Sequence, residues 1–417
     1  MRAVVLSIGT ELVQGLSLDT HSAAISRELT GIGVEVLRHV TVGDETRAIA
    51  EALRLAAADA DLVVATGGLG PTLDDCTRQA LAEVMGVALV EDPAATVHLE
   101  GWAKVRGRTL SPSNRIQTLL PRGATLLPNP VGTAVGIDAR IGRTRVFCMP
   151  GVPVEMRTML AGEVMPRLRE AQGRRVTILR TVRTYGMPES LLGERLADLM
   201  APERHPHVGT AVHGGMIDVH VYASGTPAEA EALASADVAT VRERLGPMVF
   251  GEGAETLETA VAALLARAGA TIALAESCTG GLVTAKLVNV PGISDHLLEG
   301  VVAYANEAKV RDLDVPAALI EHHGAVSEPV ARAMAEGVRR RAGADVSVGI
   351  TGIAGPAGGT AEKPVGTVWF AVADGAGTQA ARVVFTGDRA EIRERAANHA
   401  LNMLRLRLLQ VLEGRGG

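Results

Sequence analysis

The first 170 residues alternate apolar, β-branched runs with segments of helical period. The predicted strands cover residues 2–9, 35–44, 61–68 and 143–150, and helices follow them at 21–33, 46–58, 74–86 and 154–171. Apolar runs of this kind, separated by helices, are typical of a parallel sheet covered on both faces. We therefore predict an α/β domain over residues 1–168, with Asp44 and Thr72 capping two of its helices.

The pattern changes over residues 169–252. We expect a strand at 176–186, a helix at 188–200, strands at 207–214 and 216–225, and a helix at 227–246. This order predicts a small α+β layer. Its residues suggest no chemistry of their own, and a linker is expected at 250–258.

The α/β pattern returns over residues 253–417. The predicted strands cover 271–277, 296–305, 345–352 and 366–373, with helices that include 256–269 and 327–343. The expected fold is therefore two α/β domains joined by a small α+β domain. Because ligands bind at the carboxyl ends of parallel strands, the glycine-rich turns that follow these strands are the candidate sites.

Composition narrows the class of protein. The chain has 417 residues, of which 47% are hydrophobic and 2% aromatic, which fits cores of small side chains in about three domains. A net charge of -6 gives no overall attraction for nucleic acid. Three cysteines without CxxC spacing argue against structural zinc and disulfides. With no leader and no long apolar run, we expect a soluble, cytoplasmic protein.

The stretch "AESCTGG" carries candidate chemistry in the last domain. A predicted strand runs into Ser277, Cys278, Thr279, Gly280 and Gly281, and a helical segment follows. Unpaired N–H groups at a helix N-terminus favour an anion, although a tight turn that needs glycine explains the same residues. Adjacent side chains of an extended segment face opposite ways, so only one of the serine and the cysteine is expected to face a ligand.

A serine nucleophile needs a base. Tyr304, Asn306 and Lys309 follow another predicted strand, and a Ser-Lys pair is a known variant of nucleophile and base. Burial would lower the lysine pKa from about 10.4 so that its amine accepts a proton. The alternative is an ordinary surface lysine.

A second glycine loop, "TGIAGPAGG", offers backbone N–H groups to an oxyanion or a phosphate. Lys363 and Arg389 are further candidate anion contacts.

The ordered motifs "AESCTGG", "GVVAYANEAK", "GAVSEPV", "TGIAGPAGG", "KPVGTVWFA" and "GDR" resemble the nicotinamide-nucleotide amidase domain of the CinA (competence/damage-inducible protein A) family. The resemblance implies hydrolysis of nicotinamide mononucleotide to nicotinate mononucleotide and ammonia, without a cofactor. It implies Ser277 as nucleophile, Lys309 as general base and Tyr304 as a hydroxyl beside them. Ala305 stands where family members often have serine. The expected substrate contacts are Thr279, Gly280, Gly281, Asn306, Thr351, Gly352, Ala354, Gly355 and Arg389.

The first domain has its own candidate site in "ATGGLGPTLDDCT". The loop of Gly67, Gly68 and Gly70 can cradle phosphate, and Asp74 and Asp75 can bind a hard divalent ion. The alternative is that acids at a helix N-terminus only complement its dipole. Further turns after other strands supply Glu11, Gly132 and Glu155.

These turns resemble the MogA/MoaB-like molybdopterin-binding fold as it occurs in CinA proteins. The resemblance implies an ADP-ribose pyrophosphatase that depends on a divalent metal, for which Asp74 and Asp75 are the candidate ligands. His21 stands where asparagine is expected and Val135 where proline is common. The middle segment corresponds to the KH-like part of the family but has no GxxG loop, so a spacer or dimer contact is expected rather than RNA binding.

The resulting expectation is a cytoplasmic enzyme of pyridine-nucleotide salvage with two activities. It would act on nicotinamide mononucleotide and ADP-ribose as a homodimer, with no nucleic-acid or membrane partner. Three alternatives remain open from the sequence: a first domain that only binds a pterin or nucleotide, a competence or DNA-repair accessory protein, and an amidase with Cys278 as its nucleophile.

Overall fold

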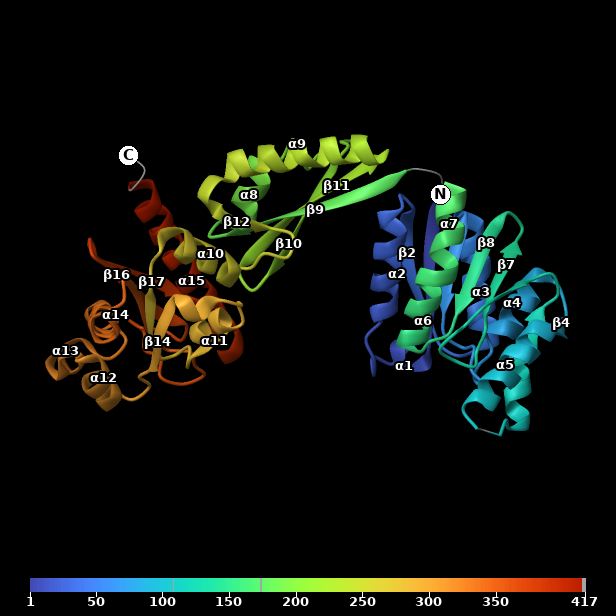
Figure 1. Cartoon of the computed structure of the whole chain (residues 1–417), viewed down its shortest axis with the longest axis horizontal. Helices are drawn as coiled ribbons and strands as arrows, with labels where there is room; N and C mark the ends of the chain where they lie inside the picture. The colour runs from blue at the N-terminus through green and yellow to red at the C-terminus, as the bar shows by residue number, and fades with distance from the viewer. Residues whose placement is uncertain (108, 173–174, 415–417) are drawn as a thin grey trace. The chain divides into compact units, whose positions relative to one another are not determined.

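The computed structural model describes residues 1–107, 109–172 and 175–414 (Figure 1). Residues 108, 173–174 and 415–417, which the predicted domains include, lie outside this description. The chain forms two compact units, each described by itself. The first comprises Met1–Leu179 and Ala223–Leu233, and the second comprises Arg180–Tyr222 and Ala234–Gly417.

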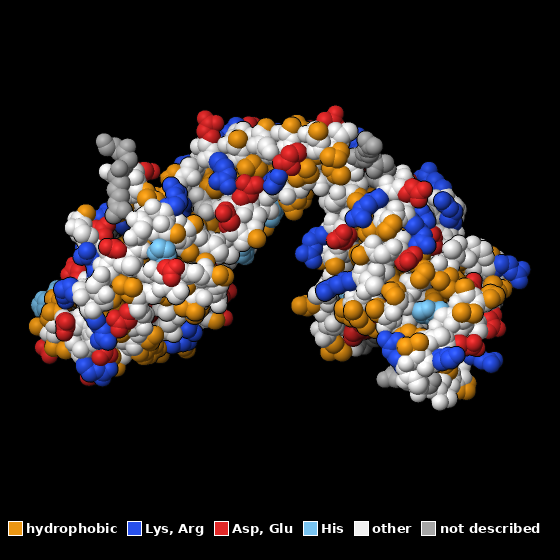
Figure 2. Space-filling view, viewed as in Figure 1, with side chains coloured by type: hydrophobic (Ala, Val, Ile, Leu, Met, Phe, Trp, Pro, Cys, Tyr) orange, Lys and Arg blue, Asp and Glu red, His pale blue; other side chains and the backbone are white. Residues whose placement is uncertain are grey.

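Each unit carries acidic and basic side chains mixed together. On the face shown in Figure 2, the described Lys and Arg side chains are interspersed with Asp and Glu and form no continuous basic patch. Within the parts of the chain that the structure describes, every helix is too short or too polar to cross a membrane.

A six-stranded sheet forms the centre of the first unit, in the order β2-β1-β3-β8-β7-β6. Its strands are β1 (Arg2–Ile8), β2 (Glu35–Val42), β3 (Leu62–Thr66), β6 (Thr125–Leu127), β7 (Gly136–Ile141) and β8 (Thr144–Met149). The first four in the sheet order are parallel, as predicted. β7 runs antiparallel to both of its neighbours, β8 and β6, so the predicted parallel sheet is mixed at one end. A short hairpin turn between β7 and β8 explains the difference, because antiparallel neighbours need no helical crossover.

Helices cover both faces of this sheet (Figure 1). They are α1 (Thr10–Val13), α2 (Thr20–Gly31), α3 (Thr46–Asp59), α4 (Thr77–Met85), α5 (Pro93–Val105), α6 (Pro153–Met159) and α7 (Met165–Gln172), with 3-10 turn η1 (Pro112–Thr118), π-helical turn η2 (Leu160–Val164) and the small pair β4 (Leu89–Glu91) and β5 (Leu119–Pro121). In β1, Val4 and Leu6 pack with α3 and α4, whereas Ala3 and Val5 pack with α2, α6 and α7. The alternation of strand side chains thus builds two cores.

The two predicted helix caps were wrong. The Asp44 carboxylate accepts a hydrogen bond from the Thr10 N–H (2.7 Å), and α3 begins without a side-chain cap. Thr72 donates its hydroxyl to Asp75, and α4 begins only at Thr77. Both side chains join turns at the carboxyl end of the sheet, where loop contacts compete with caps.

A four-stranded sheet in the order β10-β11-β9-β12 corresponds to the predicted α+β layer. Its strands are β9 (Val176–Tyr185), β10 (His207–His213), β11 (Met216–Gly225) and β12 (Val249–Glu252), with helices α8 (Glu189–Arg195) and α9 (Pro227–Leu245) and the 3-10 turn η3 (Gly246–Met248). Apolar side chains of α8 and α9 cover one face. The prediction of a linker at 250–258 was wrong for its first residues. They belong to β12, which pairs antiparallel with β9.

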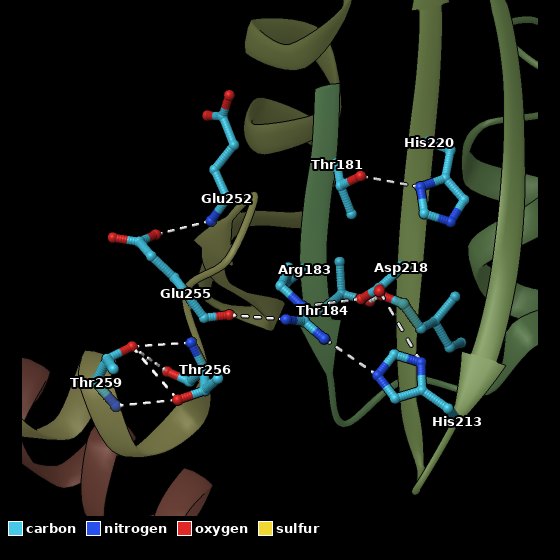
Figure 3. Close-up of polar contacts among 11 residues, drawn as sticks. Thr181, Arg183, Thr184, His213, Asp218, His220, Glu252, Glu255, Thr256 and Thr259 are labelled. Carbon is cyan, nitrogen blue, oxygen red and sulfur yellow. Dashed lines mark hydrogen bonds and ion pairs between the residues drawn. The ribbon is translucent and has the colours of Figure 1, made fainter. Parts of the chain in front are cut away.

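One guanidinium joins this sheet to the start of the last domain (Figure 3). Arg183 donates from Nε to Asp218 (3.1 Å), from Nη1 to the carbonyl of Glu255 (3.1 Å) and from Nη2 to Nε2 of His213 (3.1 Å). Because a guanidinium can only donate, the His213 ring accepts through Nε2 and carries its hydrogen on Nδ1. The contact with Glu255 fixes the turn just before the next helix.

The last domain is built on a five-stranded sheet in the order β14-β13-β15-β16-β17. Its elements are β13 (Ile272–Glu276), β14 (Leu297–Val302), β15 (Val346–Gly352), β16 (Thr367–Asp374) and β17 (Gly377–Val384), with α10 (Leu257–Ala268), α11 (Leu282–Val288), η4 (Ile293–Asp295), α12 (Asn306–Leu313), α13 (Ala317–His323), α14 (Glu328–Ala342) and α15 (Arg389–Gly414). The first three strands are parallel and β16 and β17 are antiparallel. In β13, Ile272 and Leu274 pack with α10 and α15, while Ala273 and Ala275 pack with α12 and α14.

A partly buried imidazole borders the core of this domain. The ring of His399 in α15 lies 4.7 Å from that of Phe370, 6.1 Å from Phe385 and 6.2 Å from Tyr185, measured between centroids. Its Nε2 is buried without a hydrogen-bond partner among the described residues. Burial lowers the pKa of His399 from 6.5 to about 4.

This pKa predicts a stability that depends on pH. Below pH 6.5 the unfolded chain binds a proton that folded His399 does not take up until about pH 4, so acid favours unfolding. The free energy of unfolding is expected to fall by roughly 2 to 3 kcal/mol between those values. The measurement is urea unfolding followed by Trp369 fluorescence in a Trp102→Phe background.

The matched variants are His399→Phe, which removes the titrating group from the core, and His322→Gln, which changes an exposed histidine. His399→Phe is expected to flatten the pH dependence and His322→Gln to leave it unchanged. An equal slope in both variants would contradict the assignment.

Candidate active site

The candidate nucleophile begins a tight turn at the carboxyl end of β13. The N–H of Ser277 donates to the carbonyl of Ile350 in β15 (3.0 Å). The preceding Glu276 is fully buried, and its carboxylate accepts from the N–H groups of Val283 (3.1 Å) and Thr284 (2.8 Å) and from the Thr284 hydroxyl (2.7 Å). The buried charge is thus satisfied by the first turn of α11, which fixes the ends of the serine turn.

Lys309 of α12 reaches this serine. Its Nζ lies 3.2 Å from Oγ of Ser277, 3.0 Å from the carbonyl oxygen of Ala303 and 3.1 Å from that of Tyr304. Carbonyl oxygens only accept, so two amine hydrogens point at them and the third direction of the nitrogen faces the serine oxygen, to which a protonated amine donates and from which a neutral amine can accept. The side chain is buried, and burial lowers the pKa of Lys309 from 10.5. The geometry is that of a hydroxyl beside a general base.

The neighbouring thiol is in a different environment. Cys278 is 5% exposed, and burial raises its pKa to about 12. A Cβ added to Gly352 would lie 3.0 Å from its sulfur, so the thiol is packed against β15. A thiol with this pKa is protonated at neutral pH and is a poor nucleophile.

A cavity of about 280 Å³ opens over the pair. Of the residues selected from the sequence, it is lined by Ser277, Tyr304, Asn306, Lys309, Thr351, Gly352, Ala354, Gly355 and Arg389. Its lining also includes Cys278, the alternative nucleophile, and Ile353, Ala357 and Gly358 of the second glycine loop, together with Ala325 and Val326 before α14, which the sequence did not single out.

Three predicted substrate contacts do not line the cavity. Thr279 is fully buried, and its hydroxyl has no hydrogen-bond partner among residues 1–107, 109–172 and 175–414. Gly280 and Gly281 have φ values of 62° and 87°, the left-handed conformation that glycine adopts without strain. These residues therefore form the tight turn that was the alternative explanation of the motif.

Two arginines in the first turns of α15 contact the site. Arg389 donates to the carbonyl of Gly355 (2.7 Å) and to the hydroxyl of Tyr304 (2.8 Å). Arg393 donates from Nη2 (2.8 Å) and Nε (3.3 Å) to the carbonyl of Thr279 and so holds the serine turn. Sequence reasoning missed Arg393, although its spacing of four residues from Arg389 placed it on the same helix face. Lys363 lies elsewhere and donates to a backbone carbonyl of α13 (2.8 Å).

The first unit has a cavity of about 380 Å³ where β1, β3 and β8 end. It is lined by the predicted residues Glu11, Gly67, Gly68, Gly70, Asp74, Asp75 and Glu155. Gly132 does not line the cavity but supports it, because an added Cβ would lie 2.2 Å from the carboxyl carbon of Glu155. At Gly67, a Cβ would lie 2.0 Å from the carbonyl oxygen of Ile8, so only glycine fits there. Asp44 and Gln117 also line this cavity and were not predicted.

The glycine loop is held by one acid and one guanidinium. Asp75 accepts from the N–H groups of Gly70 (2.8 Å) and Thr72 (2.8 Å). Arg78 is fully buried and donates from Nη2 to the carbonyl of Leu69 (2.7 Å), and burial lowers its pKa to about 10. Both oxygens of Asp75 are therefore used by the loop.

The carboxylates around this cavity form no closed metal cage. Asp74 is exposed, and no group of three metal-ligating side chains occurs among the described residues. Mg²⁺ is commonly held by one or two carboxylates together with phosphate oxygens of a ligand. The oxygen donors present fit an ion shared in that way with a diphosphate.

A second, smaller lobe of about 210 Å³ adjoins the first and shares Ile8, Glu11 and Gly151 with it. His21 lines this lobe and is not a helix cap, since α2 is capped by Asp19. Val135 is 1% exposed and packs into a small apolar cluster, so it contacts neither cavity.

Comparison with known proteins matches every part of the chain. The family models that match are "Probable molybdopterin binding domain" at residues 4–170, "Damage-inducible protein CinA KH domain" at 179–251 and "CinA C-terminal domain" at 254–408. The "CinA-like protein" of Citrifermentans bemidjiense is 45% identical over 100% of both chains. This chain belongs to the CinA family. The "CinA-like protein" of Anaeromyxobacter dehalogenans is also 45% identical, over 98% of this chain and all of its own.

Solved structures resemble single domains of this CinA chain. A crystal structure of CinA from Thermoplasma acidophilum is 35% identical, covers 40% of this chain and 96% of its own, and has a TM-score of 0.37. MoaB from Thermus thermophilus is 26% identical over 41% of this chain and 93% of its own, with a TM-score of 0.29. The family models and the full-length relatives confirm the family resemblance, and the sheets of the structure confirm the predicted fold class.

Proposed function

We propose that the C-terminal domain hydrolyses the carboxamide of nicotinamide mononucleotide, giving nicotinate mononucleotide and ammonia. The observation that supports this most is the 3.2 Å separation of the Ser277 hydroxyl and the buried Lys309 amine beside a cavity. An amide is a poor electrophile, so its cleavage by serine needs a base that also returns a proton to the departing nitrogen.

In the proposed reaction, neutral Lys309 takes the proton of Ser277 as its oxygen attacks the carboxamide carbon. The tetrahedral oxyanion is expected to accept from the N–H of Cys278, the residue after the nucleophile. Collapse of this species breaks the C–N bond, and protonated Lys309 gives its proton to the leaving ammonia. Water then attacks the acyl-serine, with Lys309 again as base, and releases the carboxylate.

The mononucleotide phosphate is the second feature that the cavity has to recognise. Arg389 lines the cavity and supplies a guanidinium, which pairs well with phosphate oxygens. Its contacts with Gly355 and Tyr304 hold it in place before a substrate binds. The N–H groups of the second glycine loop supply further donors in the proposal.

A second activity is proposed for the first unit, hydrolysis of ADP-ribose with a divalent metal. Its support is the cavity that joins a glycine loop to several carboxylates. The loop N–H groups would bind the diphosphate, and Asp74, with Asp75 behind it, would hold the ion. A bound metal would neutralise charge on the diphosphate and activate water. Both reactions act on small nucleotides, and the proposal includes no nucleic-acid or membrane partner.

The amidase proposal predicts different effects of two neighbouring substitutions. Ser277→Ala is expected to lower kcat for ammonia release from nicotinamide mononucleotide by at least about 10³-fold, because the nucleophile is lost. Cys278→Ala is expected to stay within a few-fold of the wild type, because that thiol is protonated and packed. Ammonia is measured with a coupled dehydrogenase, and circular dichroism checks folding. Full activity of Ser277→Ala would refute the assignment.

The lowered pKa of Lys309 predicts the pH profile. Only the neutral amine accepts a proton, so kcat should rise with pH through the Lys309 pKa, which lies below 10.5, and then level off. The measurement is kcat from pH 7 to 10.5 with saturating substrate. Lys309→Arg keeps the charge but cannot act as base, so it should be inactive throughout, and a flat wild-type profile would contradict the role.

The metal proposal predicts that ADP-ribose cleavage stops in EDTA and returns with Mg²⁺ or Mn²⁺. Asp74→Asn is expected to lower the rate by about 10- to 100-fold without changing the melting temperature. Glu28→Gln, an exposed acid on α2, is the control. Formation of AMP and ribose 5-phosphate is followed by chromatography. If ADP-ribose binds but is not hydrolysed with any divalent ion tested, the first unit only binds nucleotides and the proposed activity is wrong.

A further inference from the structure

The smaller lobe of the first unit has an acceptor-rich lining. Besides His21, its lining includes the acidic residues Glu11 and Asp19, the hydroxyl residues Ser17 and Thr20, and aliphatic residues such as Leu12 and Leu18. The carboxylate of Glu11 lies at the junction, since this residue lines both lobes. No phenyl, phenol or indole ring occurs in the lining, so the lobe lacks the aromatic platform on which nucleobases commonly stack.

Hydrogen bonding fixes which nitrogen of His21 is free. The Thr66 hydroxyl donates to the carbonyl of Pro150 (3.0 Å), so toward Nδ1 of His21 (3.3 Å) it can only accept. Nδ1 therefore carries the hydrogen, and Nε2 is the acceptor nitrogen of a neutral ring. In the described part of the chain no residue donates to that Nε2.

The surroundings favour the neutral ring. Burial lowers the pKa of His21, nearby Arg157 adds to that effect and Asp19 opposes it. His21 also lies in the first turn of α2, where the helix dipole disfavours a cation. Glu11, from the turn after β1, is the remaining charged group of the lining.

We propose that this lobe binds a ribose whose vicinal hydroxyls donate hydrogen bonds to Nε2 of His21 and to the Glu11 carboxylate. The inference rests on the proposed binding of a nucleoside diphosphate in the adjoining larger lobe. A diphosphate on the glycine loop and a ribose in the smaller lobe would meet at the shared residue Glu11. Carboxylates are common acceptors for ribose hydroxyls, which supports the assignment of ligand class.

His21 is in this proposal a residue that determines specificity, and not a catalytic one. Its replacement by a residue without an acceptor should lower the affinity for ligands that place a ribose diol in the lobe. The affinity for ligands that do not should be unchanged. ADP-ribose contains two riboses, and the experiment separates them.

Affinities are measured by calorimetry on the full chain with Ca²⁺, with chromatography to verify that the ligand stays intact. The probes are ADP-ribose, ADP and 2′,3′-dideoxy-ADP, and the variants are His21→Phe and His21→Asn, with His39→Phe on β2 as the control. His21→Phe should weaken the ribose-dependent affinity about 10-fold, because one buried acceptor is lost. His21→Asn, which offers an amide oxygen, should retain part of it.

A lower affinity of the variant for ADP-ribose alone would place the terminal ribose of ADP-ribose in the lobe. A lower affinity for ADP-ribose and ADP, with that for 2′,3′-dideoxy-ADP unchanged, would place the adenosine ribose there. Equal weakening of all three ligands, or no change in any, would overturn the proposal. If wild-type protein binds none of them, diphosphate binding itself fails and the inference falls with it, a result distinct from a changed preference among bound ligands.

Discussion

The burial of one amine is the constraint around which the C-terminal site is arranged. Lys309 lies in the first turn of α12, which follows β14, and the carbonyls of Ala303 and Tyr304 between these two elements replace the water it loses. The third direction of the amine faces Ser277 only because β13 and β14 are adjacent and parallel. A change in strand order would therefore destroy the pair even if every local element formed.

In both cavities, hydrogen bonds from side chains hold a glycine turn. The turn is thereby kept rigid while its outer face stays open to a ligand. In the C-terminal domain, Glu276 accepts from backbone N–H groups and Arg393 donates to a carbonyl of the turn. In the first unit, Asp75 and Arg78 do the same for the other glycine loop. Because these charged groups bond to backbone groups, their burial costs less than that of unpaired charges, although the Nε of Arg78 is buried without a partner among the described residues.

The sequence predicted features that depend on neighbouring residues better than features that depend on contacts between distant residues. The central strands and several amphipathic helices were found correctly, since their periodicity lies within a few residues, but β6, β7 and β17 and the helices α5 and α15 were not predicted. Strand β12 was missed because it is short, contains glycine and gains its pairing from β9, far away in sequence. The family motif identified Lys309, but Arg393 was missed, because the carbonyl to which it donates, that of Thr279, is distant in sequence. The capping of α3 failed for the same reason, as Asp44 was drawn into a contact between turns.

His21 and Val135 stand where the family resemblance led us to expect other residues. Of the two, only His21 lines a cavity. Val135 turns its side chain into a small apolar cluster, so a valine there changes packing and leaves the cavity wall to its neighbours Thr133 and Ala134. His21 lines the smaller lobe. Its hydrogen bond to Thr66 places the ring hydrogen on Nδ1, so Nε2 is left as a hydrogen-bond acceptor. An asparagine can offer either a donor or an acceptor by rotating its amide, whereas this imidazole offers an acceptor alone while it stays neutral. A change of residue at position 21 should therefore alter which ligand groups the lobe accepts.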